Sequence, residues 1–223
     1  MIVSSSHTIS QTASCPLCHQ AGARRLFFSK DRIHNLPGTF GLFRCAACHA
    51  IFIQPWLTAD ELAGYYPKEY GRYRYSRSLV KNKRGRWHRL VRENYYGYPR
   101  SEKKLPAALS KPIAFALALV MAKGVIRYHG EGTILDVGCG GGSYLYRLRQ
   151  WGWDSYGVEP GEVGVKQARA LGLEVRHGML ADARFPDAFF DVVRLSHVLE
   201  HLPNPNETFR EINRILKPQG LVY

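Results

Sequence analysis

The sequence predicts an α/β fold in which a small β-hairpin module precedes a doubly wound, mostly parallel sheet. From residue 130 onward, apolar strand-like runs alternate with helical patterns, as in βαβ units. Before residue 56, short β-type runs are separated by turn residues and two cysteine pairs. Residues 1–130 carry 21 Lys/Arg against 6 Asp/Glu, whereas residues 131–223 carry 10 against 12. This asymmetry predicts two units with different surroundings.

We predict four segments along the chain: a disordered N-terminus at 1–14, the hairpin module at 15–56, a basic helical linker at 57–129 and the α/β domain at 130–223. The first segment lacks the basic start and apolar run of a secretory signal, so we expect a cytoplasmic protein. Five cysteines in such a chain favour a reducing compartment, where clustered thiols are metal ligands more often than disulfides.

The hairpin module is expected to contain the strands RRLFFS, TFGLFRC and AIFIQP. It also repeats the pattern C-x-x-C-H, as CPLCH at 15–19 and CAACH at 45–49. Each copy alone would suit covalent haem, but haem attachment needs export to an oxidising compartment. Together the copies offer four thiols on two knuckles, a pattern typical of a tetrahedral structural zinc site. The predicted zinc ligands are Cys15, Cys18, Cys45 and Cys48. Unmetallated thiols and a Cys3His set that uses His49 are the alternatives.

The linker is strongly basic and partly apolar. Residues 71–92 hold nine Lys/Arg and no acid, with Tyr73, Tyr75 and Trp87 among the cations. An apolar helix is expected over 104–129, interrupted by Pro112 and Gly124; its stretch at 112–122 is shorter than the about 20 residues that span a bilayer. The basic run suits a solvated helix face, a nucleic acid through phosphates and stacked bases, or peripheral contact with the anionic inner face of a membrane.

A glycine-rich loop, LDVGCGGGS at 135–143, ends the first strand of the α/β domain. Glycines there let a ligand approach the backbone, and the following helix presents free N–H groups. The dinucleotide pattern G-x-G-x-x-G/A fails because its last position is Ser143. An acidic residue followed by G-x-G-x-G fits instead, through Asp136, Gly138, Gly140 and Gly142.

This second pattern resembles motif I of the class I S-adenosylmethionine-dependent methyltransferases. GVEP, ARFPDAFFDVV, HVLEHLPNP and LKPQG resemble further family segments, in the same order and spacing. The resemblance covers residues 130–223 and implies a Rossmann-like methyltransferase sheet, S-adenosylmethionine as cofactor and methyltransferase activity. The family sheet has seven strands and this sequence reaches the fifth, so we expect a C-terminally truncated sheet. The helix after HVLEHLPNP is expected to run from Asn206 to Gly220.

The resemblance also assigns cofactor contacts. It implies that Asp136 fixes the methionine end through its amino group, that Gly138 and Gly140 leave room for it, and that Glu159 holds the ribose hydroxyls. Cys139 and Gly142 complete the loop.

Three further positions carry open alternatives. Cys139 is expected to serve as a small residue rather than a nucleophile. The family often has an acidic residue just before its fourth strand, whereas this chain has HGMLADA. The adenine contact therefore falls to Asp182 or to backbone near Leu180, and the alternative is that Asp182 only caps a turn.

His197 and His201 follow the fourth strand of the domain, at the edge where ligands bind in open α/β sheets. They are the candidate catalytic bases or acceptor contacts, and the alternative is that they pack around the cofactor or cap the next helix. With Glu200 they also spell H-x-x-E-H, a zinc-protease motif that needs a single helix; we expect none, because His197 ends a strand. A divalent ion that orients the acceptor is a further alternative.

A zinc module ahead of such a domain resembles two groups of bacterial enzymes. One methylates sugars and cell-envelope glycans, and the other methylates guanine in 23S rRNA. The segments GWDSYGVEP, ARFPDAFFD and HVLEHLPNP look closer to the first group. We therefore expect direct methyl transfer to a sugar-linked or other small-molecule acceptor. An RNA methyltransferase is the first alternative, and a chain that binds S-adenosylmethionine without turnover is the second.

Overall fold

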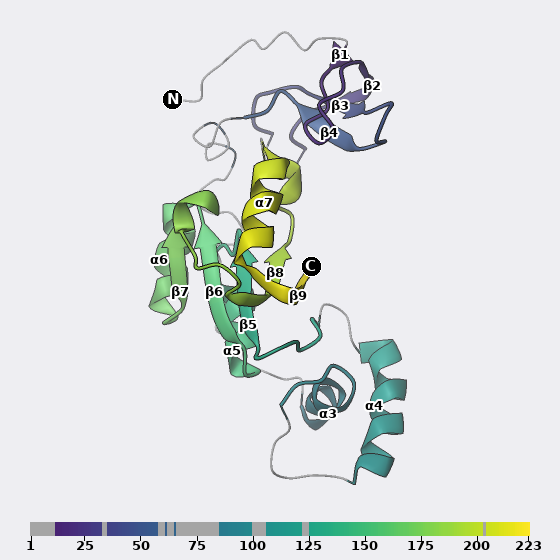
Figure 1. The fold of residues 1–223 in the computed structure, drawn as a ribbon, viewed down its shortest axis with the longest axis vertical. Helices are drawn as coiled ribbons and strands as arrows, with labels where there is room; N and C mark the ends of the chain where they lie inside the picture. The colour runs from purple at the N-terminus through teal and green to yellow at the C-terminus, as the bar shows by residue number, and fades with distance from the viewer. Residues whose placement is uncertain are drawn as a thin grey trace.

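The computed structural model describes residues 12–32, 35–57, 61, 65, 85–99, 106–121, 125–202 and 204–223. These residues form two separate sheets, helices that flank the second sheet, and a further pair of helices apart from both sheets (Figure 1). The predicted disordered segment 1–14 lies almost entirely outside the described residues, and so does the basic run up to residue 84. The four segment boundaries stay predictions.

The N-terminal module is a four-stranded antiparallel sheet in the order β1-β2-β3-β4. Its strands are β1 (Thr12–Ala13), β2 (Ala23–Ser29), β3 (Phe40–Arg44) and β4 (Ile51–Gln54). Its core gathers around Phe43 and Phe52, whose rings stack 5.9 Å apart. The three predicted strands of this module are confirmed.

The C-terminal unit contains a five-stranded parallel sheet in the order β7-β6-β5-β8-β9. The strands are β5 (Thr133–Val137), β6 (Asp154–Glu159), β7 (Glu174–His177), β8 (Phe190–Leu195) and β9 (Leu216–Val222). The connecting helices are α5 (Ser143–Gln150), α6 (Glu162–Ala170) and α7 (Pro205–Ile215). The predicted alternation of strands and helices, and with it the α/β class, is confirmed.

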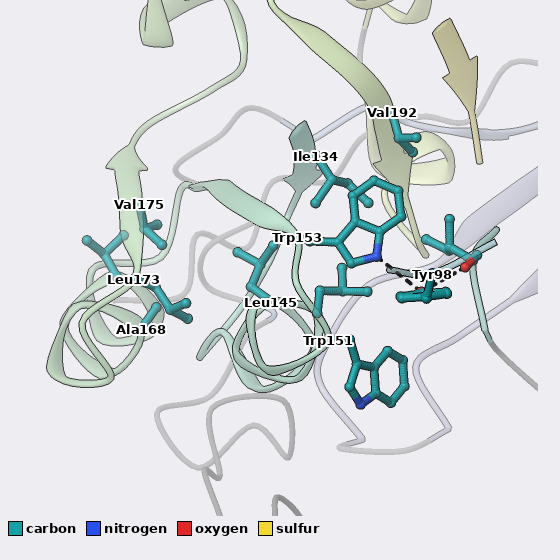
Figure 2. Packing of buried hydrophobic residues seen from close by; sticks show 12 residues of the cluster. Tyr98, Ile134, Leu145, Trp151, Trp153, Ala168, Leu173, Val175 and Val192 are labelled. Atoms are coloured by element: carbon teal, nitrogen blue, oxygen red, sulfur yellow. Dashed lines mark hydrogen bonds between the residues drawn. The ribbon is translucent and has the colours of Figure 1, made fainter. Parts of the chain in front are cut away.

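Two hydrophobic clusters cover the two faces of this sheet. One packs α5 and α6 against the sheet through Leu145, Leu148 and Ala168, as Figure 2 shows in part. The other packs α7 through Ile212 and Ile215. Because alternate side chains of a strand point to opposite faces, Ile134 joins the first cluster and Leu135 the second. Helices on both faces make the sheet doubly wound.

Two details of the sequence prediction are wrong. The helix expected over 206–220 ends at Ile215, and residues 216–222 form β9. Pro218 disfavours helical geometry at the residue before it, and Gln219 has a positive φ of 67°. The helix expected to break at Pro112 instead runs through it, as α4 (Ala107–Met121).

A helical pair lies at the end of the C-terminal unit opposite the N-terminal module (Figure 1). It consists of α3 (Arg86–Asn94) and α4. The Arg92 guanidinium lies 4.3 Å from the centre of the Trp151 ring. Just after α3, the buried hydroxyl of Tyr98 accepts from Trp153 Nε1 at 3.1 Å and donates to the Ile126 carbonyl at 2.8 Å (Figure 2). The contact between Arg92 and Trp151 and these two buried hydrogen bonds therefore attach the helical pair to the amino edge of the sheet.

Candidate functional site

The glycine loop lies between β5 and α5, at the carboxyl edge of the sheet. The Gly138 N–H donates to the Val158 carbonyl at 2.8 Å, which ties the loop to β6. Gly138 has a φ of 69°, and a Cβ there would lie 2.5 Å from the Val198 side chain. A Cβ at Gly142 (φ 76°) would lie 2.5 Å from Leu173. Both positions therefore require glycine, and Gly142 is required for packing against Leu173, the residue before β7.

Glu159 ends β6 and joins two loops at the same edge. Its carboxylate is buried and accepts two backbone hydrogen bonds of 2.8 Å, one from the Gly140 N–H and one from the Gly161 N–H. These two bonds hold the carboxylate at the edge of the sheet, and a carboxylate oxygen can accept more than one hydrogen bond. The geometry is compatible with the predicted ribose contact.

Asp136 is 2% exposed and pairs with an arginine of β8 that sequence reasoning missed. Arg194 Nη1 donates to Asp136 Oδ1 at 2.7 Å, and the two residues are register partners on adjacent strands. The same guanidinium lies 4.1 Å from the centre of the Tyr144 ring, in the first turn of α5. The carboxylate expected to hold an ammonium group therefore already has a cationic partner.

Cys139 lies inside the glycine loop and is unsuited to nucleophilic chemistry. Burial raises the pKa of its thiol far above the ordinary value, and the nearby carboxylates of Asp136 and Glu159 raise this pKa further. Because the thiolate is the reactive form, Cys139 stays an inert thiol at neutral pH. Its geometry fits the expectation of a small loop residue.

Asp182 lies in a short 3-10 helix, η2 (Ala181–Ala183). Its Oδ2 accepts from the Met179 N–H at 3.1 Å, and its own N–H donates to the Met179 carbonyl at 3.1 Å. Asp182 therefore caps its own turn, as the alternative from the sequence anticipated. The adenine contact stays a prediction.

His197 and His201 lie beyond the carboxyl end of β8, and both side chains are exposed. His197 has a φ of 56°, and its Nδ1 lies 3.5 Å from Glu200 Oε1. His201 lies in η3 (Leu199–His201), a single 3-10 turn. The H-x-x-E-H segment thus does not lie on one α-helix, as the protease motif would require.

The four cysteines of the N-terminal module converge. Their Sγ atoms all lie within 4.8 Å of one another, and among the described residues they are the group suited to a metal ion. The Sγ atoms of Cys15 and Cys48 are 3.6 Å apart, and those of Cys18 and Cys45 are 3.5 Å apart. These separations are too long for disulfides, whereas zinc with four bonds of about 2.3 Å places thiolates about 3.8 Å apart. The residues therefore fit a tetrahedral ion.

The two knuckles have the same local geometry. In the first knuckle, the Cys15 N–H donates to the Gln20 carbonyl and the His19 N–H donates to the Cys15 carbonyl. In the second knuckle, the Cys45 N–H donates to the Ala50 carbonyl and the His49 N–H donates to the Cys45 carbonyl. His19 and His49 have φ values of 60° and 61°. Both histidines therefore shape the turn, and neither belongs to the metal-binding group.

Hydrogen bonding in the second knuckle favours the thiolate form of Cys45, whereas desolvation and the neighbouring thiols raise the pKa of Cys18. The Cys48 N–H donates to Cys45 Sγ at 3.5 Å, and backbone hydrogen bonds of this kind lower the pKa of Cys45 to about 6. Metals bind the thiolate, so this backbone geometry favours metal capture at neutral pH.

The first knuckle contacts the C-terminal unit directly. The Asn206 side-chain amide, in the first turn of α7, donates to the Pro16 carbonyl at 3.2 Å and to the Leu17 carbonyl at 2.9 Å. The same amide lies 3.3 Å from His19 Nε2. Since α7 begins on the side of the sheet where β8 ends, the module lies at the carboxyl edge (Figure 1).

Comparison with known proteins assigns the C-terminal unit. A family model described as a methyltransferase domain matches residues 135–223. A ubiquinone biosynthesis O-methyltransferase of Pseudomonas paraeruginosa is 37% identical over 100 residues, covering 41% of this chain and 42% of the relative. Its namesake from Pectobacterium carotovorum is 32% identical over 111 residues, covering 45% and 46%. The chain thus spans less than half the length of these curated relatives.

A solved S-adenosylmethionine-dependent methyltransferase from Mesorhizobium loti is 25% identical, with a TM-score of 0.40, and covers 43% of this chain and 46% of that chain. The family match begins at Leu135 and contains the glycine loop, Glu159 and the histidine segment. The strand order around that loop places both buried carboxylates at one edge. Residues 135–223, which include the glycine loop and both buried carboxylates, therefore match a methyltransferase domain family.

Proposed function

We propose that this protein transfers a methyl group from S-adenosylmethionine directly to a small-molecule acceptor. The observation that carries the proposal is the pair of buried carboxylates, Asp136 and Glu159, beside a glycine loop in a methyltransferase domain. Burial of a charged group is tolerated where the group is paired, and here Arg194 pairs with Asp136 and two backbone N–H groups bond Glu159. The concentration of these two carboxylates at the ligand-binding edge of the sheet supports a cofactor site there.

S-adenosylmethionine brings a methyl group that its sulfonium already makes electrophilic, so the protein mainly binds, aligns and desolvates. In this proposal Glu159, held in place by two backbone hydrogen bonds, accepts the ribose hydroxyls. Asp136 faces the methionine ammonium while Arg194 keeps the carboxylate oriented. Gly138 and Gly140 give the cofactor room near the backbone.

In this proposal the exposed histidines remove the proton from the acceptor. His197 has a carboxylate neighbour, Glu200, whose Oε1 lies 3.5 Å from the imidazole Nδ1 and can orient the ring. His201 lies one 3-10 turn away. We assign to this pair the removal of a proton from the acceptor, or contact with it.

The names of the curated relatives support an oxygen atom as the methylated position, since they are O-methyltransferases of ubiquinone biosynthesis. We propose a sugar-linked hydroxyl or another small-molecule hydroxyl for this chain. Transfer of labelled methyl from S-adenosylmethionine to a panel of nucleotide sugars and of catechol-type phenols tests the choice. Label on a phenol alone would refute the sugar-linked acceptor, and cofactor binding without label on any acceptor would favour binding without turnover.

The N-terminal module is proposed to hold one structural zinc ion through Cys15, Cys18, Cys45 and Cys48. Its contact with the first turn of α7 supports a role in shaping the acceptor side of the site. Elemental analysis of the purified protein should find about one zinc per chain. Iron together with a haem absorption band would contradict this assignment.

An RNA acceptor is the second candidate because one strand of the module exposes aromatic and basic side chains together. Phe27 and Phe28 of β2 are about half exposed, and the Arg25 guanidinium lies 4.2 Å from the centre of the Phe28 ring. Such residues can stack on bases and contact phosphates. Salt-sensitive binding of ribosomal RNA fragments that Phe27→Ala and Phe28→Ala weaken would favour this candidate over a small molecule.

The cofactor assignment is tested at Glu159. Glu159→Gln removes the charge that the ribose hydroxyls would contact, so calorimetry should show at least about tenfold weaker S-adenosylmethionine binding. Glu162→Gln is the matched control, because Glu162 is exposed at the start of α6 and pairs with Lys166 instead. Circular dichroism should show that both variants are folded. Unchanged affinity in folded Glu159→Gln would refute the ribose contact.

A further inference from the structure

Helix α4 reverses the usual distribution of side-chain size between core and surface. Its buried residues, Ser110, Ala114 and Ala118, are small. Between residues 109 and 120 every exposed position except Lys111 is apolar. The large exposed side chains form what we call the apolar arc: Leu109, Ile113, Phe115, Leu119 and Val120.

The packing of α4 on α3 explains this reversal. Ser110 Oγ donates to Asn94 Oδ1 at 2.8 Å, and Phe115 contacts the Tyr95 ring at 5.9 Å between ring centres. Small residues bring α4 close to α3, so the larger side chains project elsewhere. At 100° per residue, the exposed apolar positions cover about 160° of the helix circumference. Leu119 and Val120 are 75% and 81% exposed. A helix that is apolar on nearly all sides is normally covered.

The sequence on either side of the apolar arc is strongly basic. Residues 71–129 contain 15 Lys/Arg and 2 Asp/Glu. Among those that the structure describes, Arg89 of α3 and Lys111 of α4 are exposed. Exposed apolar side chains next to positive charges are complementary to an anionic lipid leaflet. Such a leaflet has apolar acyl chains beneath negatively charged headgroups.

The dimensions of α4 suit a helix that lies on a membrane. With 15 residues it is about 22 Å long, shorter than the hydrocarbon core of about 30 Å. Within the described part of the chain, no helix has the length and apolar character needed to cross a membrane.

The position of the helical pair suits this role too. Arg92 packs on Trp151, which follows the end of α5, and Tyr98 bonds Trp153, which precedes β6. Both contacts lie at the amino edge of the sheet, whereas the glycine loop and the N-terminal module lie at the carboxyl edge. A surface that covers α4 would leave the cofactor edge accessible.

We propose that α4 binds peripherally to an anionic lipid surface, with the apolar arc inserted at the boundary between headgroups and acyl chains. The exposed cations Arg89 of α3 and Lys111 of α4 contact the headgroups. This proposal does not depend on the acceptor or on turnover, because it concerns the opposite edge of the sheet.

The full chain should co-sediment with phosphatidylcholine vesicles that contain about one third phosphatidylglycerol, and much less with phosphatidylcholine alone. Salt at about 1 M should weaken binding, because it shortens the Debye length to about 3 Å. Failure to bind the anionic vesicles would overturn the proposal.

Two sets of variants separate the apolar and electrostatic contributions. Leu119→Gln combined with Val120→Gln should weaken partitioning at least about tenfold, because both side chains would enter the acyl boundary. Arg89→Gln combined with Lys111→Gln should weaken it by about tenfold on anionic vesicles. Ile51→Gln on β4 is the matched control: Ile51 is 60% exposed but belongs to the N-terminal module, so binding should be unchanged.

The variants replace exposed side chains, so their thermal transitions should match that of the unaltered protein. Equal vesicle binding by the Leu119/Val120 variant would overturn the insertion of α4. A dimer that this variant dissociates, in a protein that does not bind vesicles, would show that a second copy covers the apolar arc. RNA binding that only the Arg89/Lys111 variant weakens, again without vesicle binding, would assign the basic surface to nucleic acid instead.

Discussion

The N-terminal module and the C-terminal unit keep their sheets together in different ways. The core cluster described for the module has six buried residues, and two of them are the metal-ligand candidates Cys15 and Cys45. The C-terminal unit has described clusters of twelve and ten residues on the two faces of its sheet. The module is thus too small to bury much apolar surface, and β2 leaves Phe27 and Phe28 about half exposed.

The comparison shows how size decides the source of stability. Small domains bury a low fraction of their surface and commonly need a metal or disulfides, whereas larger α/β units are stabilised by burial alone. In the N-terminal module the four thiols occupy positions that a larger domain would fill with buried apolar side chains. Perturbing the metal and perturbing the core should therefore affect different sheets.

Metal removal should have the largest effect. With a strong zinc chelator, or in Cys45→Ser, the module should unfold, because metal binding supplies most of the folding free energy of such sites. Hydrogen exchange should show lost protection of β2, β3 and β4 and retained protection of β5, β6 and β8. Protection of the module that survives complete metal removal would contradict the comparison.

A large-to-small substitution in the core of the C-terminal unit should destabilise that unit and leave the N-terminal module intact. Phe190 is fully buried and contacts Phe185 edge-on at 4.9 Å between ring centres. Phe190→Ala should lower the free energy of unfolding of this unit by about 3–5 kcal/mol in urea titrations, with zinc content unchanged. Phe28→Ala, at an exposed position of the module, serves as the control and should change it by less than about 0.5 kcal/mol.

The Asp136–Arg194 pair should matter less than the core but more than a surface ion pair. Arg194→Met leaves a buried carboxylate without this partner, and we expect a loss of about 2–3 kcal/mol, reduced from the fully buried case because the arginine is 21% exposed. A double-mutant cycle with Asp136→Asn measures the coupling. Additive effects of the two substitutions would show that the pair contributes no coupling energy.

The smallest effect is expected at the contact between the two regions. Asn206→Ala removes two side-chain hydrogen bonds to the first knuckle, worth about 1 kcal/mol together after solvent compensation. Exchange of amides near residues 15–19 should become faster while the stability of each sheet stays the same. Glu207→Gln, an exposed position on the same helix, is the control. Unchanged exchange in Asn206→Ala would show that the docking does not restrain the knuckle.

Local patterns predicted most of the fold and much of the candidate site. The strands β5, β6 and β8, the glycine loop and the four cysteines were all predicted, because periodicity and ligand spacing are encoded within a few residues. The boundary between α7 and β9 was misplaced, since helical patterning continues up to the residues before Pro218.

The contacts that sequence reasoning missed join distant parts of the chain. Arg194 and Asp136 are 58 residues apart, and they meet because β8 pairs with β5 in a particular register. Small residues of α4 are compatible with burial or exposure, so the apolar arc emerged only once α3 was placed against it. Such contacts depend on topology, which no single motif specifies.

The Asn206 contact also has a consequence for synthesis at the ribosome. The amide that bonds the Pro16 carbonyl lies 190 residues further along the chain. Translation at about 5–20 residues per second would therefore separate the emergence of the two by roughly ten to forty seconds. During that interval the nascent module has no α7 to dock on. Zinc binding would then keep the two knuckles of the nascent chain folded until α7 has been synthesised.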